Sequence, residues 1–453
     1  DSISLLNNTT GVTINLGTNF ISTGDVISSI ENIYGGDGNN TFTGSSGDND
    51  LFSGSGLDRL YSGAGNNTLY SGNGNDVLFA GSGSNTLYGG GNDDFFYGGA
   101  NATNSYYGGS GADSLYFGTH TSGSISLNLA TGTISGGQIG GFEAVYGFNN
   151  AAGSDDLTGT SGSESFYGLA GMDILRGEDG NDFLYGGDGD DILYGGAGAD
   201  SLNGGFGVDY ISYYGSSSAV EVDLDAQTVV GGDATGDVIS GIESAGGSNS
   251  GDDTLTGSSA ANELHGFGGI DNLDGLGGND ILYGGDGNDD FDGGDGNDTM
   301  YGGNGNDYFK DLVGTDTFYG GAGVDSLSFS GQATGMTINL DTNAISGGPG
   351  TGDAIDSIEI LYGGTGTDTF TGSAADNQLY GGSGSAVDYL YGGDGNDVLD
   401  GGDGNDSIKG GDGNDTLYGA AGNDRMEGGA GADTISGGAG DNYLYYEDSS
   451  AGV

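Results

Sequence analysis

The 453-residue chain contains 107 Gly and one Pro, and only 33% of its residues are hydrophobic, which is too little for several conventional cores. Asp and Glu number 66 against five Lys and Arg, so the formal net charge of -61 excludes nucleic acid and anionic membrane surfaces as partners. The absence of Cys excludes disulfides and thiolate metal sites, which leaves oxygen ligands and a hard cation to neutralise the chain.

Residues 1–123 form the first of four stretches that we expect to be separate structural units. It opens with alternating apolar residues at Val12-Ile14-Leu16 and continues as a degenerate nine-residue repeat. One position of the repeat holds Asp58, Asp76 and Asp94, but Asn67 and Asn85 in alternate units. We expect cations to bind most weakly in this array.

The second stretch, residues 124–218, begins with alternating apolar residues at Ile125-Leu127-Leu129 and is then more regular. Its repeats read GEDGND at 177–182, GGDGDD at 186–191, GGAGAD at 195–200 and GGFGVD at 204–209. Gly permits dihedral angles that other residues avoid, so each six-residue string is predicted to reverse the chain.

The third stretch, residues 219–334, contains the clearest array, in which the nine-residue period runs from 265 to 328 without a slip. Apolar residues recur every nine positions, at Leu264, Leu273, Leu282, Phe291, Met300, Phe309, Phe318 and Leu327. An Asp stands two positions before each of these except the first. The repeating unit is therefore GGxGxD followed by x, an apolar residue and x.

The fourth stretch, residues 335–453, carries GGDGND at 392–397, 401–406 and 410–415 and GGAGAD at 428–433. In every array, the three residues after the turn are predicted to form a short strand whose central side chain points inward. Two nonapeptides then make one complete coil, with two parallel sheets joined by two columns of turns. At about 4.8 Å per strand, roughly 25 coils would form a rod on the order of 100 Å long.

The nonapeptide resembles the RTX, or hemolysin-type, calcium-binding repeat family. The resemblance implies an all-β fold, a parallel β-roll or β-helix solenoid with calcium ions in the GGxGxD turns, interrupted by wider coils. It also implies multiple Ca²⁺ ions, each held by turn carbonyls and by Asp carboxylates two nonapeptides apart. The metal ligands expected on this basis are Asp173, Asp182, Asp191, Asp200, Asp209, Asp271, Asp280, Asp289, Asp298, Asp307, Asp325, Asp388, Asp397, Asp406, Asp415, Asp424 and Asp433.

In the clearest array, one ligand column would contain Asp271, Asp289, Asp307 and Asp325, and the other Asp280, Asp298 and Asp316. The turn before Asp316 reads DLVGTD and lacks the first two glycines, so its site is doubtful. The turn before Asp271, GFGGID, also departs from the pattern.

Four segments with alternating apolar residues break the rhythm and are predicted to be longer strands. Two are those already named, and the others begin at Val220-Val222-Leu224 and Met336-Ile338-Leu340. The intervals between Leu16, Leu129, Leu224 and Leu340 differ only by about one coil, which predicts four tandem units. We interpret the segments as wider coils that splice successive arrays, and a docking surface between molecules is the alternative.

Aromatic residues that follow the inward apolar position are expected to point outward. One sheet of the clearest array would present His265, Tyr283, Tyr301 and Tyr319, and the other Asp274, Asp292, Lys310 and Ser328. The first array would be less segregated, with Tyr70 and Tyr88 opposing Tyr61, Phe79 and Tyr97. The tyrosines either stack along the ladder or expose a strip for self-association or carbohydrate binding.

The sequence does not predict an enzyme. The recurring GxG lacks the strand, turn and helix of a nucleotide site, and the two histidines, His120 and His265, are far apart and accompany no catalytic motif. We expect a calcium-dependent secreted structural protein that forms an extracellular rod, surface layer, filament or matrix at the cell surface. It would be a homo-oligomer or polymer, with cell-surface polysaccharide as a further partner and no membrane insertion. An adhesin stalk, or the C-terminal calcium-folding module of a larger RTX toxin or enzyme, is the alternative.

Overall fold

The structure is a computed structural model that describes residues 1–99, 103–120, 122–310, 313–348 and 351–446. Its fold is an all-β parallel solenoid of about 23 coils, as the nine-residue period predicted. Two compact units compose it: Asp1–Tyr213 with Asp233–Ile242, and Tyr214–Gly232 with Glu243–Val453. Among the described residues the one helical element is the 3-10 turn η1 (Gly232–Ala234), and no helix there is long and apolar enough to cross a membrane.

Unit 1 contains two sheets whose strands alternate along the chain. The first has β1 (Ser2–Ser4), β4 (Asn32–Tyr34), β6 (Asp50–Ser55), β8 (Thr68–Asn73), β10 (Thr86–Gly91), β12 (Ser105–Ser110), β14 (Ser126–Asn128), β15 (Thr133–Ile134), β16 (Gly137–Gly140), β18 (Asp156–Thr158), β20 (Ile174–Gly180), β22 (Ile192–Gly198) and β24 (Tyr210–Ser212). The second has β2 (Thr13–Asn15), β3 (Phe20–Ile21), β5 (Thr41–Thr43), β7 (Arg59–Tyr61), β9 (Val77–Phe79), β11 (Phe95–Tyr97), β13 (Ser114–Tyr116), β17 (Ala144–Tyr146), β19 (Ser165–Ala170), β21 (Phe183–Asp188), β23 (Ser201–Phe206) and β27 (Val238–Ser240).

Unit 2 also contains two sheets whose strands alternate along the chain, one on each side of the coils. On one side lie β28 (Ser244–Gly246), β30 (Glu263–Gly268), β32 (Ile281–Asp286), β35 (Thr299–Asn304), β38 (Thr317–Ala322), β40 (Thr337–Asn339), β41 (Ala344–Ser346), β42 (Ala354–Asp356), β44 (Thr369–Thr371), β46 (Tyr389–Asp394), β48 (Ser407–Asp412), β50 (Arg425–Ala430) and β52 (Tyr443–Tyr445). On the other lie β25 (Glu221–Asp223), β26 (Thr228–Val230), β29 (Thr254–Ser258), β31 (Asn272–Leu276), β33 (Asp290–Asp292), β36 (Tyr308–Phe309), β39 (Ser326–Ser328), β43 (Ile360–Tyr362), β45 (Gln378–Tyr380), β47 (Val398–Asp400), β49 (Thr416–Tyr418) and β51 (Thr434–Ser436). The short strands β34 (Asp295–Gly296) and β37 (Val313–Gly314) pair separately.

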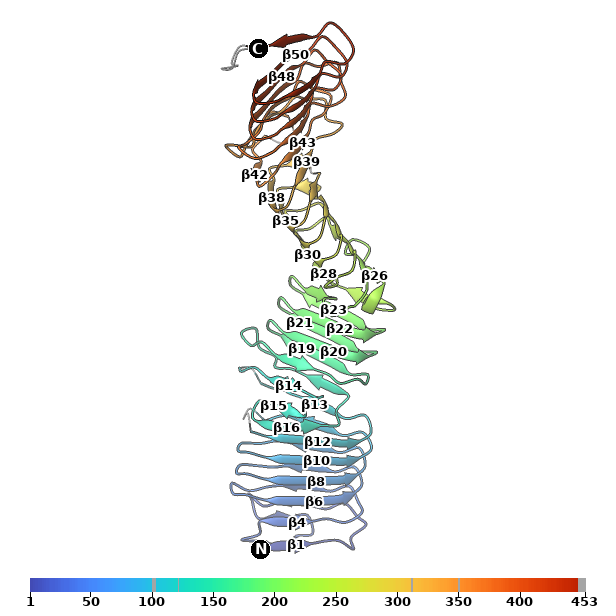
Figure 1. Ribbon diagram of the computed structural model, residues 1–453. Coiled ribbons are helices and arrows are strands. Elements are labelled where there is room, and N and C mark those ends of the chain that lie inside the picture. Colours follow the sequence, from blue (N-terminus) through green and yellow to red (C-terminus); the bar gives the residue numbers. More distant parts are fainter. Residues whose placement is uncertain (100–102, 121, 311–312, 349–350, 447–453) are drawn as a thin grey trace. The chain divides into compact units, whose positions relative to one another are not determined.

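Residues one coil apart pair in parallel register, which stacks β6, β8, β10 and β12 on one another (Figure 1). In the clearest array, Ile281 pairs with Thr299 and Thr299 with Thr317, each two nonapeptides further along. The central residue of each such triplet is inaccessible to solvent, as at Leu282 and Met300. The coil of two nonapeptides and the inward apolar position are therefore confirmed.

The four interrupting segments are wider coils, but the prediction of longer strands was wrong. Their first strands, β2, β14, β25 and β40, have three residues each and turn back as antiparallel hairpins. An Asn or Asp side chain at the strand end accepts the backbone N–H three residues later, as Asn339 does from Thr342 at 2.8 Å. A local turn thus ends the strand where apolar alternation alone indicated continuation. The solenoid resumes after the hairpin, since Thr337 of β40 pairs in parallel with Thr369 of β44.

Candidate calcium sites

Glycine at two turn positions allows successive turns to stack closely. In the turn Gly284–Asp289, Gly285 and Gly287 have φ angles of +111° and +155°, which favour glycine. A Cβ atom on Gly287 would collide with the carbonyl of Gly269, one coil earlier. The turn that ends at Asp271 shows that the first of these positions tolerates a substitution, because Phe267 adopts a φ of +71° there.

The turn aspartates form continuous columns through one of their two carboxylate oxygens. The Oδ1 atom of Asp289 accepts the backbone N–H of Asp271 at 2.8 Å, and Asp307 accepts that of Asp289 at 2.9 Å. The opposite column runs from Asp280 through Asp298 to Asp316 with distances of 2.7 and 2.9 Å. Both predicted columns of the clearest array therefore exist as hydrogen-bonded ladders.

The second carboxylate oxygen is buried without a hydrogen-bond partner in most of these residues. Within the described residues, 15 of the 17 predicted ligands have such an Oδ2 atom: Asp173, Asp182, Asp191, Asp200, Asp209, Asp271, Asp280, Asp289, Asp298, Asp307, Asp325, Asp397, Asp406, Asp415 and Asp424. Of the other two, Asp388 is buried and its Oδ1 accepts the N–H of Asp368, while Asp433 is half-buried and its Oδ1 accepts that of Asp415. Burying an ionised carboxylate without a partner is expensive, so each column needs positive charge.

These Oδ2 atoms lie beside a small space between successive turns, next to the first glycine of each turn. A Cβ atom on Gly275 would lie 2.5 Å from both Asp280 Oδ2 and the carbonyl oxygen of Gly293, which belongs to the turn one coil later. Carboxylate and carbonyl oxygens at such short range are the ligand set that Ca²⁺ prefers. No group of three or more His, Cys, Asp or Glu side chains suited to one metal occurs in the described part of the chain, so carbonyls must complete any site.

Burial and like-charged neighbours raise the pKa of the inner aspartates. Burial raises the pKa of Asp191 and Asp271 to about 7, with the negative charges of neighbouring aspartates adding to the effect. The pKa of Asp94 rises to about 8 for the same two reasons. Without a cation, the columns resist full ionisation at neutral pH.

At several column ends the protein itself satisfies the second oxygen. Asp155 Oδ2 accepts the N–H of Phe148 at 2.5 Å, Asp253 Oδ2 accepts that of Ser248 at 2.7 Å, and Asp237 Oδ2 accepts the hydroxyl of Tyr213 at 3.1 Å. The unpartnered oxygens are thus concentrated in the column interiors, between two turns. This contrast fits interior sites for cations and ends that close without them.

The sequence identified Asp58, Asp76 and Asp94 as repeat positions of weak cation binding, but it missed Asp113 and other members of the columns. The Oδ2 atoms of these four residues are also buried without a hydrogen-bond partner, and Asp113 ends a regular GGSGAD string at 108–113 that could have identified it. The interrupting segments extend four columns, because Glu143, Asp237, Asp353 and Glu359 accept the backbone N–H groups of Asp113, Asp200, Asp316 and Asp325. The recurring TGD strings could have identified Asp237 and Asp353, and the IE string Glu359, whereas Glu143 stands in the shorter string GGFEA.

The doubtful site at Asp316 keeps its place in the column. Its Oδ1 accepts the N–H of Asp298, and its own N–H donates to Asp353 at 2.9 Å. Positions 311 and 312, which replace the first two glycines of its turn, lie outside the described residues.

Both histidines have partners. Nε2 of His120 donates to the carbonyl of Gly98 at 2.7 Å, and Nε2 of His265 lies 2.7 Å from a carboxylate oxygen of Glu263.

Stacked coils whose turns present carboxylate and carbonyl oxygens define a parallel β-solenoid with candidate cation sites between its turns. The family model of the RTX calcium-binding nonapeptide repeat, in its four-copy form, matches overlapping stretches that together cover residues 34–103, 151–211, 248–332 and 354–448. These stretches make up more than half of the chain, so the protein belongs to the RTX calcium-binding repeat family, as the sequence indicated. A search of curated proteins found no match.

Proposed function

We propose that this protein is a secreted, calcium-scaffolded structural protein that assembles outside the cell into a surface layer, filament or matrix. The observation that carries the proposal is the set of Asp Oδ2 atoms, found in each of the two units, that are buried without a hydrogen-bond partner. A chain with 66 acidic and five basic residues cannot supply the missing positive charge itself. Calcium, when bound, supplies that charge and draws turn carbonyls and carboxylates of successive coils together.

Folding would then follow calcium concentration. In a compartment with little calcium, the acidic chain repels itself and stays expanded, which is compatible with export before folding. Outside the cell, where calcium is abundant, the ions bind between the turns and draw successive coils together. The family's repeats support this order of events, and we place the protein's working location at the cell surface.

The outer faces support a role in assembly rather than catalysis. In unit 1, the rings of Tyr34, Phe52, Tyr70, Tyr88 and Tyr107 form one ladder with centroids 4.3–4.9 Å apart. Their planes are within 9° of parallel, so each ring face is covered by the next ring and the ring edges are left at the surface. A flat strip of this kind suits packing of one copy against another better than stacking on a sugar ring. We therefore propose self-association as its main contact, with polysaccharide as a secondary partner.

The test uses the purified 453-residue chain with and without calcium. Circular dichroism should show full β structure with calcium and loss of most of it after chelation, and electron microscopy should show ordered assemblies with calcium only. Full β signal in chelator would overturn the calcium scaffold. Calcium-folded protein that stays monomeric at every concentration would overturn assembly and favour a module of a larger toxin, adhesin or enzyme.

A further inference from the structure

The first array of unit 1 has two turn columns of different chemistry. One begins at Asn40 and continues through Asp58, Asp76, Asp94 and Asp113, and the other consists of Asn49, Asn67, Asn85 and Asn104. The sequence predicted the weakest cation binding in this array, with Asn in place of Asp in alternate nonapeptides. Because one coil contains two nonapeptides, the structure places these substitutions in one column, on one side of the solenoid.

The asparagine column satisfies its own oxygen atoms. Asn85 Oδ1 accepts the backbone N–H of Asn67 at 3.1 Å and also its side-chain Nδ2 at 2.8 Å. Asn104 Oδ1 accepts the corresponding two groups of Asn85 at 2.8 and 3.1 Å. An amide oxygen has two lone pairs, so both of these oxygens are fully used without a cation.

The amide nitrogens also bond the turn carbonyls, which are the other ligands expected of a calcium site. One N–H of Asn67 Nδ2 bonds Asn85 Oδ1, and the other is shared between the carbonyls of Ala64 and Gly65 at 3.2 and 3.1 Å. Nδ2 of Asn85 makes longer contacts, both 3.4 Å, with the carbonyls of Gly81 and Gly83. The neutral NH₂ group thus takes the place that a cation would take in an aspartate turn.

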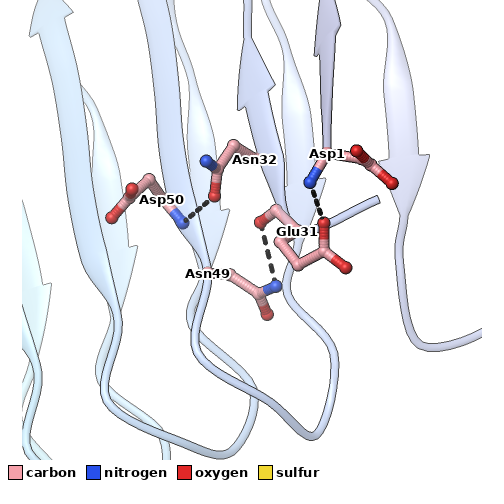
Figure 2. Close-up of polar contacts among 5 residues, drawn as sticks. All are labelled: Asp1, Glu31, Asn32, Asn49 and Asp50. Atoms are coloured by element: carbon pink, nitrogen blue, oxygen red, sulfur yellow. Dashed lines mark hydrogen bonds and ion pairs between the residues drawn. The ribbon is translucent and has the colours of Figure 1, made fainter. Parts of the chain in front are cut away.

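The first member of the column, Asn49, bonds a carbonyl of the preceding coil instead of its own turn. Figure 2 shows Nδ2 of Asn49 donating to the backbone carbonyl of Glu31, at 2.9 Å, beside the bond from the N–H of Asp50 to Asn32. The four asparagines are at most 2% exposed, so these amide bonds are shielded from water.

The aspartate column of the same array lacks such partners. The Oδ2 atoms of Asp58, Asp76, Asp94 and Asp113 are buried and unpartnered. At the first two sites serine replaces the first turn glycine and occupies a turn carbonyl, because Ser53 Oγ donates to the carbonyl of Ser71, and Ser71 Oγ to that of Gly89, each at 2.8 Å. The same hydroxyls interact with the carboxylates of Asp58 and Asp76 and lower their pKa, against the larger effect of burial. Asp94 and Asp113 retain glycine at the first turn position, at Gly89 and Gly108.

We propose that the first array holds cations along its aspartate column only, chiefly at Asp94 and Asp113, while the asparagine column is a metal-free amide ladder. This inference rests on the proposed calcium function and refines it. The amide side keeps its turn hydrogen bonds when calcium is removed, and the array therefore retains partial order from which the coils can refold.

The first test is hydrogen exchange of the full-length wild-type protein, with calcium and after chelation. Turns that contain Asn67 and Asn85 should stay more protected in chelator than the turns that contain Asp76 and Asp94. Equal loss of protection on the two sides would overturn the proposal.

The second test is a matched pair of variants. Asp94→Asn should reduce the number of bound calcium ions by one or two, whereas Asn85→Ala should leave the number unchanged and lower thermal stability with and without calcium. A lower ion count in Asn85→Ala would show that the amide column binds metal and would overturn the proposal. Wild-type protein that binds no calcium would instead overturn the proposed function itself.

Discussion

The two oxygen atoms of a turn aspartate have separate roles. Oδ1 accepts a backbone N–H from the preceding coil, as Asp289 does from Asp271 at 2.8 Å, and so fixes the side chain. Oδ2 of the same residue is buried without a hydrogen-bond partner. Because the first oxygen orients the second, the carboxylate is held in place before any ion binds. Removing such a carboxylate should therefore affect both the ladder and the adjoining cation sites.

Asp298→Ala should lower the calcium stoichiometry by one or two ions while distant arrays stay loaded, because a solenoid is coupled mainly between neighbours. Asp295→Ala is the matched control, since it removes the same charge from an exposed position of the same turn. Ion counting on the folded proteins checks the prediction. An unchanged count in Asp298→Ala would contradict the assignment of its column.

The raised pKa values of the turn aspartates predict that the metal-free protein is more stable at acidic pH than at neutral or higher pH. The folded-state pKa values of Asp191, Asp271 and Asp280 are about 7, above the ordinary aspartate value of 3.8, so the folded state binds more protons than the unfolded state between pH 3.8 and about pH 7. The stability that protonation contributes is fully present below about pH 4 and is lost as the pH rises through about 7. Calcium-free protein should therefore show more β signal at pH 5 than at pH 8. With calcium the order should reverse, because protonation displaces the ion.

At the scale of the element, the sequence predicted the strands better than the connections. The inward residues Leu282, Phe291 and Met300 were identified because burial requires an apolar side chain every nine positions. The hairpins were not identified, since a strand end such as Asn339 depends on a side-chain bond that hydrophobic alternation does not reveal. The asparagine column was read as lost acid, because spacing alone cannot show that an amide nitrogen reaches turn carbonyls.

The aromatic ladders confirm the stacking interpretation and leave the binding interpretation as a prediction. In the clearest array, His265, Tyr283, Tyr301 and Tyr319 stack with centroids 4.5–4.9 Å apart and planes within 16° of parallel. The other sheet pairs Asp274 with Asp292, which bonds Lys310 at 2.9 Å. The two faces of this array therefore differ, as expected.

Tyr301→Ser should destabilise the calcium-loaded protein, because it removes two ring contacts worth about 0.5–1.5 kcal/mol each. The control is Tyr391→Ser, at a tyrosine of unit 2 whose neighbours on the adjoining strands are Thr371 and Lys409 instead of aromatic rings. Thermal unfolding at saturating calcium measures both. Equal destabilisation by the two substitutions would mean that burial of the side chain, and not stacking, is responsible.

At the scale of the whole molecule, charge and repetition act together. The -61 formal charge opposes folding, and each cation site offsets part of it only where two coils meet. Stability is then roughly a sum over coils and their neighbours, so complete coils should be removable. Successive nonapeptides alternate between the two sheets, so the sheet that a strand joins depends on the number of nonapeptides before it. Deletions in the clearest array of unit 2 test this dependence.

Deletion of two nonapeptides, from Gly284 to Tyr301, removes one complete coil. Phe318 and Tyr319 then pair with β32, so Tyr319 stacks on Tyr283 and each downstream Asp keeps its column. Deletion of one nonapeptide, from Gly293 to Tyr301, leaves every repeat locally intact but moves each downstream strand to the opposite sheet. Tyr319 would then follow Asp292, and the wide coil that begins at β40 would be turned by half a coil relative to the strands before it. Both proteins should fold with calcium, because neither deletion breaks a nonapeptide. Only the deletion of a complete coil should assemble as the intact chain does, when the two are compared by electron microscopy. Equal assembly after the single-nonapeptide deletion would show that contacts between copies do not depend on which sheet carries the tyrosines.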